Sequence, residues 1–576
     1  MKLPQIRRRE LSTLSDWADL PPILARVLAG RGIQRPDEVP LTLDQLPAPT
    51  LMPGLDKAVS LLLEARRQGW KILIIGDYDA DGATATALMV RGLTLLGLTT
   101  PGFLVPDRFE YGYGLSPEIV ELARQDANPD LIITVDNGIA SLDGVAAAHA
   151  AGIKVLITDH HLPGEVLPDA DAIVNPRLDP ASPFLNLAGV GVAFYLILAL
   201  RSALRDADLL PANANPASLL DLVALGTVAD VVVLDRINRI LVEQGLRRMR
   251  AGQCIPGIIE LLKVGRRDPD RVVAQDLGFI VGPRLNAAGR LSDMTHGISC
   301  LLCDDPQRAR ELAEELDSIN RERRGIEQGM RDEAMIQVQR LKEQGDLPLG
   351  LCLHDEHWHE GVVGILASRV KEAVHRPVIA FARAQEKGLL KGSGRSIQGL
   401  HLRDALDAVA TRHPGMLRKF GGHAMAAGLT LAADQFEQFR QAFAETVALL
   451  APADIFTTVI DTDGLLEESE LTLKNAELLA HAFPWGQGFP APRFDGEFEV
   501  LAQRVVGERH LKLTLGLPAS RGVIDAIHFN APVADWPRNC QRVSGIYQLG
   551  VNDYRGQRSP QLLFEYLVPV ISRDRG

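Results

Sequence analysis

Cysteine and long hydrophobic runs are scarce in this chain. It contains 5 cysteines in 576 residues, and only Cys300 and Cys303 have the spacing of a metal-ligand pair. Because no second pair accompanies them, the sequence predicts neither a disulfide framework nor a zinc site. The longest apolar run, residues 187–200, contains glycines and is too short to cross a bilayer. The opening residues lack the apolar core of a signal peptide, so we expect a cytoplasmic protein without a membrane segment.

An excess of positive charge is also absent. The chain has 61 Lys and Arg residues against 73 Asp and Glu, which gives a formal net charge of −12. A polyanionic partner would therefore have to bind at a local basic surface or through metal ions. Low-complexity segments and repeats of solenoid length do not occur either. The length itself predicts several domains.

Apolar segments alternate with helical segments between residues 71 and 235. The apolar segments are KILIIGD, TPGFLVPD, DLIITVDNG and IKVLITDHH. Strands without polar alternation, joined by helices, are typical of a parallel sheet that is covered on both faces. The region therefore predicts an α/β domain.

Acidic residues, joined by two histidines, follow the apolar segments of this region. They are Asp77, Asp79 and Asp81 in DYDADG, Asp136 in VDNG, Asp159, His160 and His161 in DHH, and Asp230 in GTVAD. The carboxyl ends of parallel strands meet at one edge of a sheet, where ligand sites gather. Alone, DYDADG could be an acidic loop that faces water. Converging carboxylates repel one another unless a cation lies among them, so the full set predicts a metal site.

A basic segment follows between residues 247 and 290, with nine Arg or Lys residues against four Asp or Glu. Within it, GPRLNAAGR combines Arg284 and Arg290 with small residues that suit a close approach to a ligand. A solvated basic face is the alternative. Residues 305–345 then predict one long charged helix, whose narrow apolar stripe is interrupted by Arg323. We expect this helix to connect two domains rather than to form an oligomer seam.

A second α/β domain is predicted over residues 347–451. Its segments LGLCLH and PVIAFAR are predicted strands, and its glycine clusters are GSGRS and GGHAMAAG. Glycine-rich turns beside an arginine can present backbone amides and a fork of donors to a phosphate. From residue 456 on, short strand-like segments predict a small barrel, for which a nucleic-acid-binding OB-fold is one candidate. We expect this barrel to be separate from the α/β domains.

The motifs, taken in order, resemble those of the DHH phosphoesterase superfamily. The matching segments are DYDADG, VDNG, DHH and GTVAD for the catalytic domain, and GSGRS and GGHAMAAG for the companion DHHA1 domain. RFEYGYGL, GPRLNAAGR, WHEGVVGILASR and the barrel-like tail are similar to the branch of bacterial single-strand-specific 5′→3′ exonucleases. The resemblance implies two α/β domains, joined by a long helix and followed by a C-terminal OB-fold-like β-barrel. The implied domains are an N-terminal segment (1–40), the DHH catalytic domain (41–235), a basic helical region with the long helix (236–345), the DHHA1 domain (346–452) and the OB-fold-like domain (453–576).

The same resemblance implies two divalent ions, Mn²⁺ or Mg²⁺, at the strand ends. Asp79 and Asp81 would each hold one ion, Asp136 would bridge both, and His160 and Asp230 would complete the shell. Asp77 is a less certain ligand. Asp159 would orient or ligate, and His161 would contact the scissile phosphate. The implied substrate contacts are Arg108, Ser393 and Arg395 to the 5′-phosphate, His359 and His423 to phosphates, and Arg284 and Arg290 along the path of the strand.

The resemblance implies a single-stranded-DNA-specific 5′→3′ exonuclease that releases 5′-mononucleotides in DNA repair and recombination. Single-strand-binding protein and repair helicases would be its partners, and no oligomer is implied. Two other functions stay open from the residues. One is a phosphodiesterase of the same superfamily that acts on short oligonucleotides or cyclic dinucleotides. The other is a non-catalytic single-strand-binding scaffold.

Overall fold

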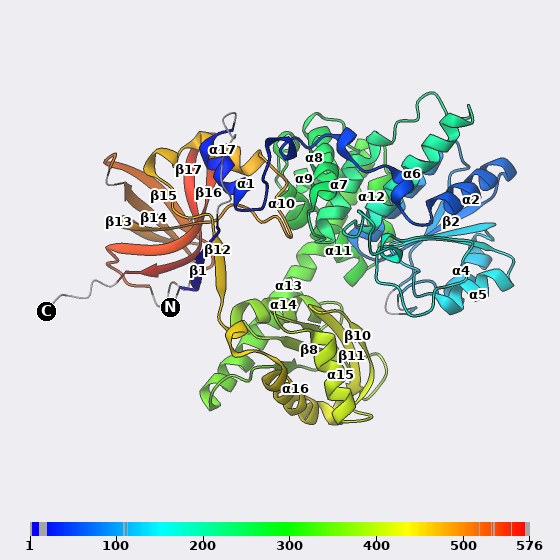
Figure 1. Ribbon diagram of the computed structural model, residues 1–576. Coiled ribbons are helices and arrows are strands. Elements are labelled where there is room, and N and C mark those ends of the chain that lie inside the picture. Colours follow the sequence, from blue (N-terminus) through cyan, green and yellow to red (C-terminus); the bar gives the residue numbers. More distant parts are fainter. Residues whose placement is uncertain are drawn as a thin grey trace. The chain divides into compact units, whose positions relative to one another are not determined.

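The structure of the protein is a computed structural model (Figure 1). The structure describes residues 3–10, 20–107, 110–111, 113–507, 509–517, 519–531, 533, 536–554 and 556–570. The chain forms two compact units. The first consists of Met1–Leu3, Arg8–Ser318 and Asp461–Gly576, and the second of Pro4–Arg7 and Ile319–Ile460. The chain passes from the first unit to the second within one helix, α13 (Pro306–Gln344), as the long charged segment predicts.

A five-stranded sheet lies at the centre of the α/β part of the first unit. Its strand order is β3-β2-β4-β5-β6, and all neighbouring strands are parallel. The strands are β2 (Ile72–Gly76), β3 (Gly102–Leu104), β4 (Leu131–Val135), β5 (Lys154–Thr158) and β6 (Ala172–Val174). β2 and β4 are buried along their whole length. The predicted parallel sheet is therefore confirmed.

Helices cover both faces of this sheet. Leu73 and Ile75 belong to an apolar cluster with residues of α4 (Pro117–Asp126) and α5 (Leu142–Ala150). Ile72 and Ile74 belong to the other, larger cluster. Its helices include α2 (Leu55–Gln68), α3 (Ala80–Leu95), α6 (Gly189–Asp206), α7 (Leu220–Ala229) and α8 (Arg236–Arg250). Because consecutive residues of a strand point to opposite faces, the continuous apolar strands serve both clusters.

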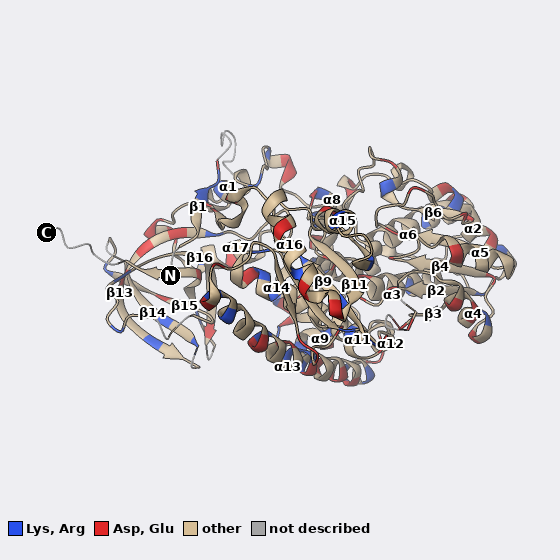
Figure 2. Cartoon of the chain, turned by 90° about the horizontal axis from the view of Figure 1, so that it is seen from below, with Lys and Arg blue, Asp and Glu red and all other residues tan. Residues whose placement is uncertain are grey.

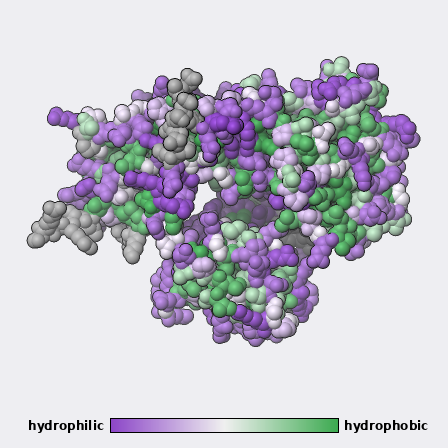
Figure 3. All heavy atoms as spheres, viewed as in Figure 1, coloured by the Kyte–Doolittle hydropathy of each residue, from purple (hydrophilic) through white to green (hydrophobic). Residues whose placement is uncertain are grey.

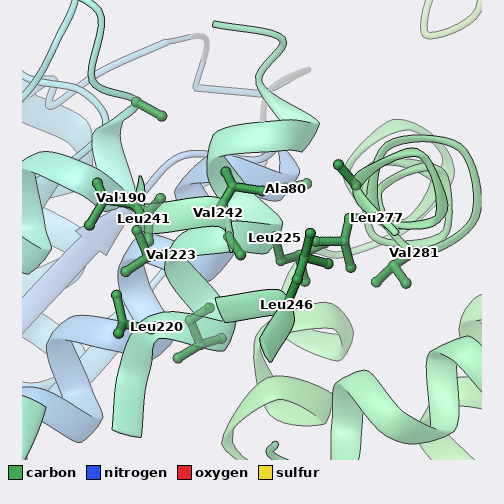
Figure 4. Close-up of a cluster of buried hydrophobic side chains, with 14 of the residues drawn as sticks. Ala80, Val190, Leu220, Val223, Leu225, Leu241, Val242, Leu246, Leu277 and Val281 are labelled. Atoms are coloured by element: carbon green, nitrogen blue, oxygen red, sulfur yellow. The ribbon is translucent and has the colours of Figure 1, made fainter. Parts of the chain in front are cut away.

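The larger core lies next to the start of α3. Figure 4 shows Ala80 of α3, Val190 of α6 and Leu225 of α7 among side chains from α8 and the segment after α10. The remaining helices of this region are α9 (Pro256–Val264), α10 (Ala274–Asp276), α11 (Gly282–Leu291) and α12 (Thr295–Leu302). Their packing fixes α3 and α7, which carry acidic residues of the predicted metal site.

The second unit contains a mixed five-stranded sheet with the order β10-β11-β9-β8-β7. Its strands are β7 (Leu351–His354), β8 (Val378–Arg383), β9 (Leu389–Arg395), β10 (Leu417–Gly422) and β11 (Ala426–Ala432). Its helices, besides its share of α13, are α14 (Val363–Val374), α15 (Leu402–Arg412) and α16 (Phe436–Leu450). The prediction that GSGRS forms a turn was wrong. Gly392–Arg395 lie within β9, where glycines allow the ring of Phe381 and the side chain of Leu402 to pack close to the strand.

The C-terminal part of the first unit is a closed barrel with the order β13-β14-β15-β17-β16, which confirms the predicted barrel. Its strands are β13 (Phe494–Val506), β14 (His510–Leu517), β15 (Gly522–His528), β16 (Arg542–Tyr554) and β17 (Gln557–Pro569). The helices α1 (Pro22–Ala29) and α17 (Leu473–His481) also belong to this unit. β12 (Val459–Thr462) pairs with β1 (Gln5–Arg8) instead of joining the barrel.

The expectation of a barrel separate from both α/β domains was wrong. Residues of the barrel belong to the same apolar cluster as residues of the helices of the α/β part, such as α7 and α8. The backbone amide of Leu234 donates to the carbonyl of Gln487 at 2.8 Å. The guanidinium of Arg239 lies 4.3 Å from the ring centroid of Phe489. The apolar side chains on both sides exclude water from one common core, so the two parts form one unit.

The surface is polar over much of the face shown in Figure 3. Acidic and basic residues are interspersed along α13 (Figure 2). A helix long and apolar enough to span a membrane was not found in the part of the chain that the structure describes.

Candidate metal centre

The loop after β2 arranges three carboxylates within one turn of chain. The Asp77 carboxylate accepts from the backbone N–H of Tyr78 at 2.7 Å. Asp79 caps α3, and its Oδ1 accepts from the N–H groups of Asp81 and Gly82 at 2.9 and 3.0 Å. An aspartate is favoured at this cap because it satisfies amides that have no partner within the helix. The alternation of aspartates in DYDADG therefore follows from a strand that turns directly into a helix.

Asp81 is held from the opposite side by the start of α6. Its two carboxylate oxygens accept from the N–H groups of Gly189 and Val190 at 2.6 and 2.9 Å. The side chain is buried, and burial together with the Asp79 charge raises the pKa of Asp81 to about 7. A cation beside it would reverse this effect, because it stabilises the ionised carboxylate.

Asp136 and His160 meet beyond the ends of β4 and β5. Oδ1 of Asp136 lies 3.1 Å from Nε2 of His160, and both side chains are buried. Neither atom has a hydrogen-bond partner among the described residues. Burial lowers the pKa of His160 to about 3, so its ring is neutral, whereas burial and the charge of Asp81 raise the pKa of Asp136. Two buried acceptors that face one another in this way fit a shared cation.

Asp230 reaches the same place from a helix and not from a strand. It is the C-cap of α7, and its carboxylate lies 3.6 Å from Nε2 of His160. Burial and the charge of Asp81 raise the pKa of Asp230. Asp230 therefore lies beside the acidic residues at the strand ends, as expected, but it follows a helix and not a strand.

Among the residues that the structure describes, three groups of side chains have their ligand atoms close enough to hold an ion. They are Asp77, Asp79 and Asp136; Asp81, His160 and Asp230; and Asp136, His160 and His161. Within each group the atoms lie within 4.8 Å of one another. Asp136 and His160 each occur in two groups, so the three groups overlap and form one cluster of possible ligands. Carboxylate oxygens with one imidazole are a donor set that suits Mn²⁺ or Mg²⁺.

Asp159 lies outside these three groups because its oxygens are already engaged. Its Oδ1 accepts from the backbone N–H groups of His160 and His161 and lies 2.7 Å from Nδ1 of His161. Its Oδ2 accepts from the N–H of Ile139 at 2.9 Å. Although burial opposes ionisation, the hydrogen bonds from His161 lower the pKa of Asp159. These contacts hold the Asp159 carboxylate against the His161 ring.

The second unit holds a separate group of predicted substrate contacts. Nη1 of Arg395 donates to Oγ of Ser393 at 3.2 Å and to the carbonyl of Gly394 at 2.8 Å. A Cβ atom on Gly364, at the start of α14, would lie 3.0 Å from Oγ of Ser393 and 3.1 Å from the Arg395 guanidinium. A helix N-terminus beside a guanidinium and a hydroxyl is suited to an anion. Burial lowers the pKa of Arg395.

Two predicted histidines lie on the same unit. Nδ1 of His359 accepts from the N–H of Gly361 at 3.0 Å, in the loop that leads to α14. His423 is exposed in the hairpin between β10 and β11, and its N–H donates to the carbonyl of Ala426 at 2.8 Å. Because Ala426 pairs with Arg395 across β11 and β9, this hairpin neighbours the strand that carries the arginine. Arg108, the third residue predicted for the 5′-phosphate, lies outside the described residues.

Comparisons with known proteins cover both units. The model of the DHH family, N-terminal domain, matches residues 71–227, the DHHA1 domain matches 341–449, and the RecJ OB domain matches 462–566. A protein named single-stranded-DNA-specific exonuclease RecJ from Escherichia coli is 52% identical over 98% of this chain and 99% of its own length. The chain belongs to the RecJ family.

Further RecJ relatives agree with this assignment. The RecJ of Salmonella typhimurium is 52% identical over 98% of this chain and 99% of its own length. The crystal structure of RecJ in complex with Mn²⁺ from Thermus thermophilus has a TM-score of 0.79 and 31% identity, and the match covers 99% of this chain and 80% of that chain. The family and the fold class expected from the motifs are thereby confirmed.

Within this RecJ-family chain, three glycines let helices approach the acidic cluster. A Cβ on Gly189 would lie 2.7 Å from Cβ of Asp136, and one on Gly226 would lie 2.9 Å from Oδ1 of Asp81. The closest approach is at Gly289, where a Cβ would lie 1.8 Å from the carbonyl oxygen of Tyr78. At each position a side chain would displace the acidic loop or its neighbours.

Asn286 was missed by the sequence analysis. Its Oδ1 accepts from the backbone N–H of Ala80 at 2.8 Å, so α11 supplies a second cap to the start of α3. With Gly289, it gives GPRLNAAGR a supporting role for DYDADG. No local signal identifies this pair, because the two partners lie 206 residues apart. The small residues of the motif were the available clue.

The basic segment is largely paired within the protein. Arg284 is buried, and its guanidinium contacts Asp317 at 2.7 Å and the carbonyl of Ile280 at 2.6 Å. Lys263 and Arg267 pair with Glu260 and Asp276. A buried guanidinium that is already paired has few donors left for a phosphate, so the contacts of Arg284 describe a link between α11 and α13. Arg290 is half-buried at the end of α11.

Proposed function

We propose that this chain is a single-stranded-DNA-specific exonuclease that hydrolyses from the 5′ end and releases 5′-mononucleotides. The observation that carries the proposal is the cluster of three overlapping groups of possible metal ligands, which Asp136 and His160 link to one another. Its RecJ relatives are named as single-stranded-DNA-specific exonucleases, and members from Thermus thermophilus were crystallised with Mn²⁺ and with Mg²⁺. The retained acidic set argues against a non-catalytic scaffold.

In this proposal, two divalent ions occupy the acidic cluster, with Mn²⁺ or Mg²⁺ as the candidates. Asp77 and Asp79 would hold one ion, Asp81, His160 and Asp230 would hold the other, and Asp136 would contribute to both. When bound, the ions supply the Lewis acidity that activates an attacking water and neutralises charge on the phosphoryl group. The hydrogen bonds from α6 to Asp81 and the Asp79 cap hold these carboxylates in place without the substrate.

His161 and Asp159 act on the substrate side of this cluster. Although burial opposes protonation, the bond to Asp159 raises the pKa of His161. Because Asp159 accepts at Nδ1, the other ring nitrogen, Nε2, is the one that can donate to an oxygen of the scissile phosphate. The imidazolium would add positive charge where negative charge develops during hydrolysis.

In this proposal, the second unit and Arg108 recognise the 5′ end and so set the direction of hydrolysis. Arg395 and Ser393, beside the N-terminus of α14, would bind the terminal 5′-phosphate dianion, and His359 and His423 would contact phosphates. Arg290 would contact the path of the strand. Phosphate contacts carry no base information, so hydrolysis is expected without sequence preference. The barrel would hold nucleotides further along the strand by stacking and charge.

The proposed cellular setting is DNA repair and recombination in the cytoplasm. Single-strand-binding protein and repair helicases are the proposed partners. Helicases produce single-stranded DNA, and single-strand-binding protein covers it. These partners follow from the substrate that we propose.

The test uses a 40-nucleotide strand in three forms, with Mn²⁺ present. A 5′-labelled single strand should release labelled mononucleotide at once, and a 3′-labelled strand should shorten progressively. A blunt duplex of the same sequence should be resistant. The control is the Asp136→Ala protein, checked for folding by circular dichroism.

Each alternative has its own outcome in this experiment. Release of the 3′ label first would reverse the polarity. Hydrolysis limited to dinucleotides or cyclic dinucleotides would select the small-substrate phosphodiesterase. Binding of the strand without any hydrolysis, in Mn²⁺ and in Mg²⁺, would select the scaffold.

A further inference from the structure

Tyr113 is a residue of the site to which the motif comparison gives no role. It lies in the loop between β3 and α4, and its hydroxyl contacts two groups of the candidate metal centre. The hydroxyl oxygen lies 3.0 Å from the backbone carbonyl of Asp136 and 3.1 Å from Nδ1 of His161. The Tyr113 and His161 rings meet edge to face, with centroids 5.8 Å apart. The loop is fixed two residues later, where the N–H of Leu115 donates to Oγ of Ser141 at 2.9 Å.

The hydrogen-bond inventory of Asp159 decides which groups donate here. Oδ1 of Asp159 already accepts from two backbone N–H groups, so it faces Nδ1 of His161 as an acceptor at 2.7 Å. Nδ1 must therefore carry a hydrogen. A carbonyl can only accept, so the single hydroxyl hydrogen of Tyr113 points to Asp136. The lone pairs of the tyrosine oxygen consequently face the hydrogen on Nδ1.

This arrangement gives the His161 ring two acceptors on one N–H. Asp159 holds it from its own turn, and Tyr113 holds it from a loop that is 48 residues away in sequence. The direction of the tyrosine hydroxyl is set by Asp136, which itself has a left-handed backbone conformation with φ of 62°. Side chains that orient an imidazole in this way act on the reacting group without touching the substrate.

We propose that Tyr113 is a positioning residue that acts through His161. Its hydroxyl, which accepts from Nδ1–H, fixes the plane of the ring, so that Nε2 is presented to the phosphate in one orientation. The inference rests on the proposed function, since the role of His161 is measured by hydrolysis. It predicts that the hydroxyl affects turnover and leaves the binding of strand and ions nearly unchanged.

The test is a double-mutant cycle of Tyr113→Phe and His161→Ala on a 5′-phosphorylated single strand. Tyr113→Phe removes one oxygen and keeps the ring against Tyr78 and His161. It should lower kcat about 10-fold, with KM, Mn²⁺ affinity and Tm unchanged. In the His161→Ala background, Tyr113→Phe should cause no further loss, because both changes remove the same orientation.

A matched control is Tyr111→Phe in the same loop. The Tyr111 hydroxyl bonds to the Glu110 side chain and not to the site, so its removal should leave kcat unchanged. Additive losses in the cycle, or a loss that appears in KM or in Mn²⁺ affinity, would overturn the positioning role. So would full turnover of His161→Ala. A wild-type protein that fails to digest the strand would refute the proposed function instead, so the two failures can be told apart.

Discussion

Nε2 of His160 lies 3.1 Å from Oδ1 of Asp136, and among the described residues neither buried atom has a hydrogen-bond partner. The neutral ring and the carboxylate are both acceptors at this contact, so the pair is stable only with a cation or a proton between them. The contact thus fits a positive charge that none of the described residues supplies there.

Asp136→Ala should abolish hydrolysis while the fold persists. Loss of the shared carboxylate removes a ligand from both cation positions, which raises the activation barrier by several kcal/mol. In the wild type, free Mn²⁺ at 100 times Kd should stabilise the fold by about 2.7 kcal/mol, and the variant should lose this shift. Kinetics and thermal unfolding with and without EDTA measure both effects. Asp126→Ala, at an exposed position of α4, is the control. More than about a tenth of wild-type turnover in Asp136→Ala would contradict the bridging role.

Arg395→Ala should raise KM for 5′-phosphorylated strands and narrow their advantage over 5′-hydroxyl strands. The guanidinium beside Ser393 and the start of α14 would otherwise pair with the terminal dianion. Adding Arg108→Ala should increase the effect. Steady-state kinetics on the two matched substrates measure it, with Arg383→Ala, exposed at the end of β8, as the control. Equal losses on both substrates would show that Arg395 supports the fold instead.

Gly289→Ala should destabilise the first unit and weaken Mn²⁺ binding. The new Cβ would lie 1.8 Å from the carbonyl oxygen of Tyr78, inside the DYDADG loop. Overpacking of this kind costs about 1–3 kcal/mol. Gly329→Ala in α13 is a matched control, because no atom lies within 4 Å of its Cβ position. The control should stabilise the helix by about 0.5–1 kcal/mol. Urea unfolding and Mn²⁺ titration compare the two, and equal stabilities would refute a close contact at Gly289.

Substitutions on the barrel surface should weaken the binding of long strands more than the turnover of very short ones. Deletion of the whole C-terminal part from residue 456 is unsuitable as a test, because it would remove Asp463, whose carboxylate pairs with the buried side chain of Arg31 at 2.7 Å. Arg504 and Phe529 are exposed on the barrel. If a base stacks on Phe529, Phe529→Ala should weaken the binding free energy of the strand by about 1–3 kcal/mol. Arg504→Ala should reduce the slope of the logarithm of the binding constant against the logarithm of salt concentration by about one, because one phosphate contact is lost.

Fluorescence anisotropy over a length series of single strands, at several salt concentrations, measures these changes. Arg440→Ala, half-buried on α16 and paired with Glu437, is the control for loss of one charge. If both barrel variants bind long strands with unchanged affinity, another surface of the protein binds these strands.

Local sequence determined the sheet and most of the metal-binding set. A buried strand is apolar along its length, and the first polar residue after it lies at the carboxyl edge of a parallel sheet. Asp77, Asp136 and Asp159 each follow such a strand, so their convergence could be predicted from short stretches. The helix α13 and the short strands of the barrel could also be predicted, because their hydrophobic patterns repeat over a few residues.

Tertiary structure decided everything that depends on partners far away in the chain. Asp230 arrives at the end of α7, Asn286 caps α3, and Arg284 is buried against Asp317. Helix packing sets these contacts, and the local pattern around an asparagine or an arginine is the same whether its partner is a phosphate or an aspartate. The barrel joins the catalytic unit because their apolar surfaces exclude water together. That burial is a property of two surfaces in contact, which neither segment of sequence carries alone.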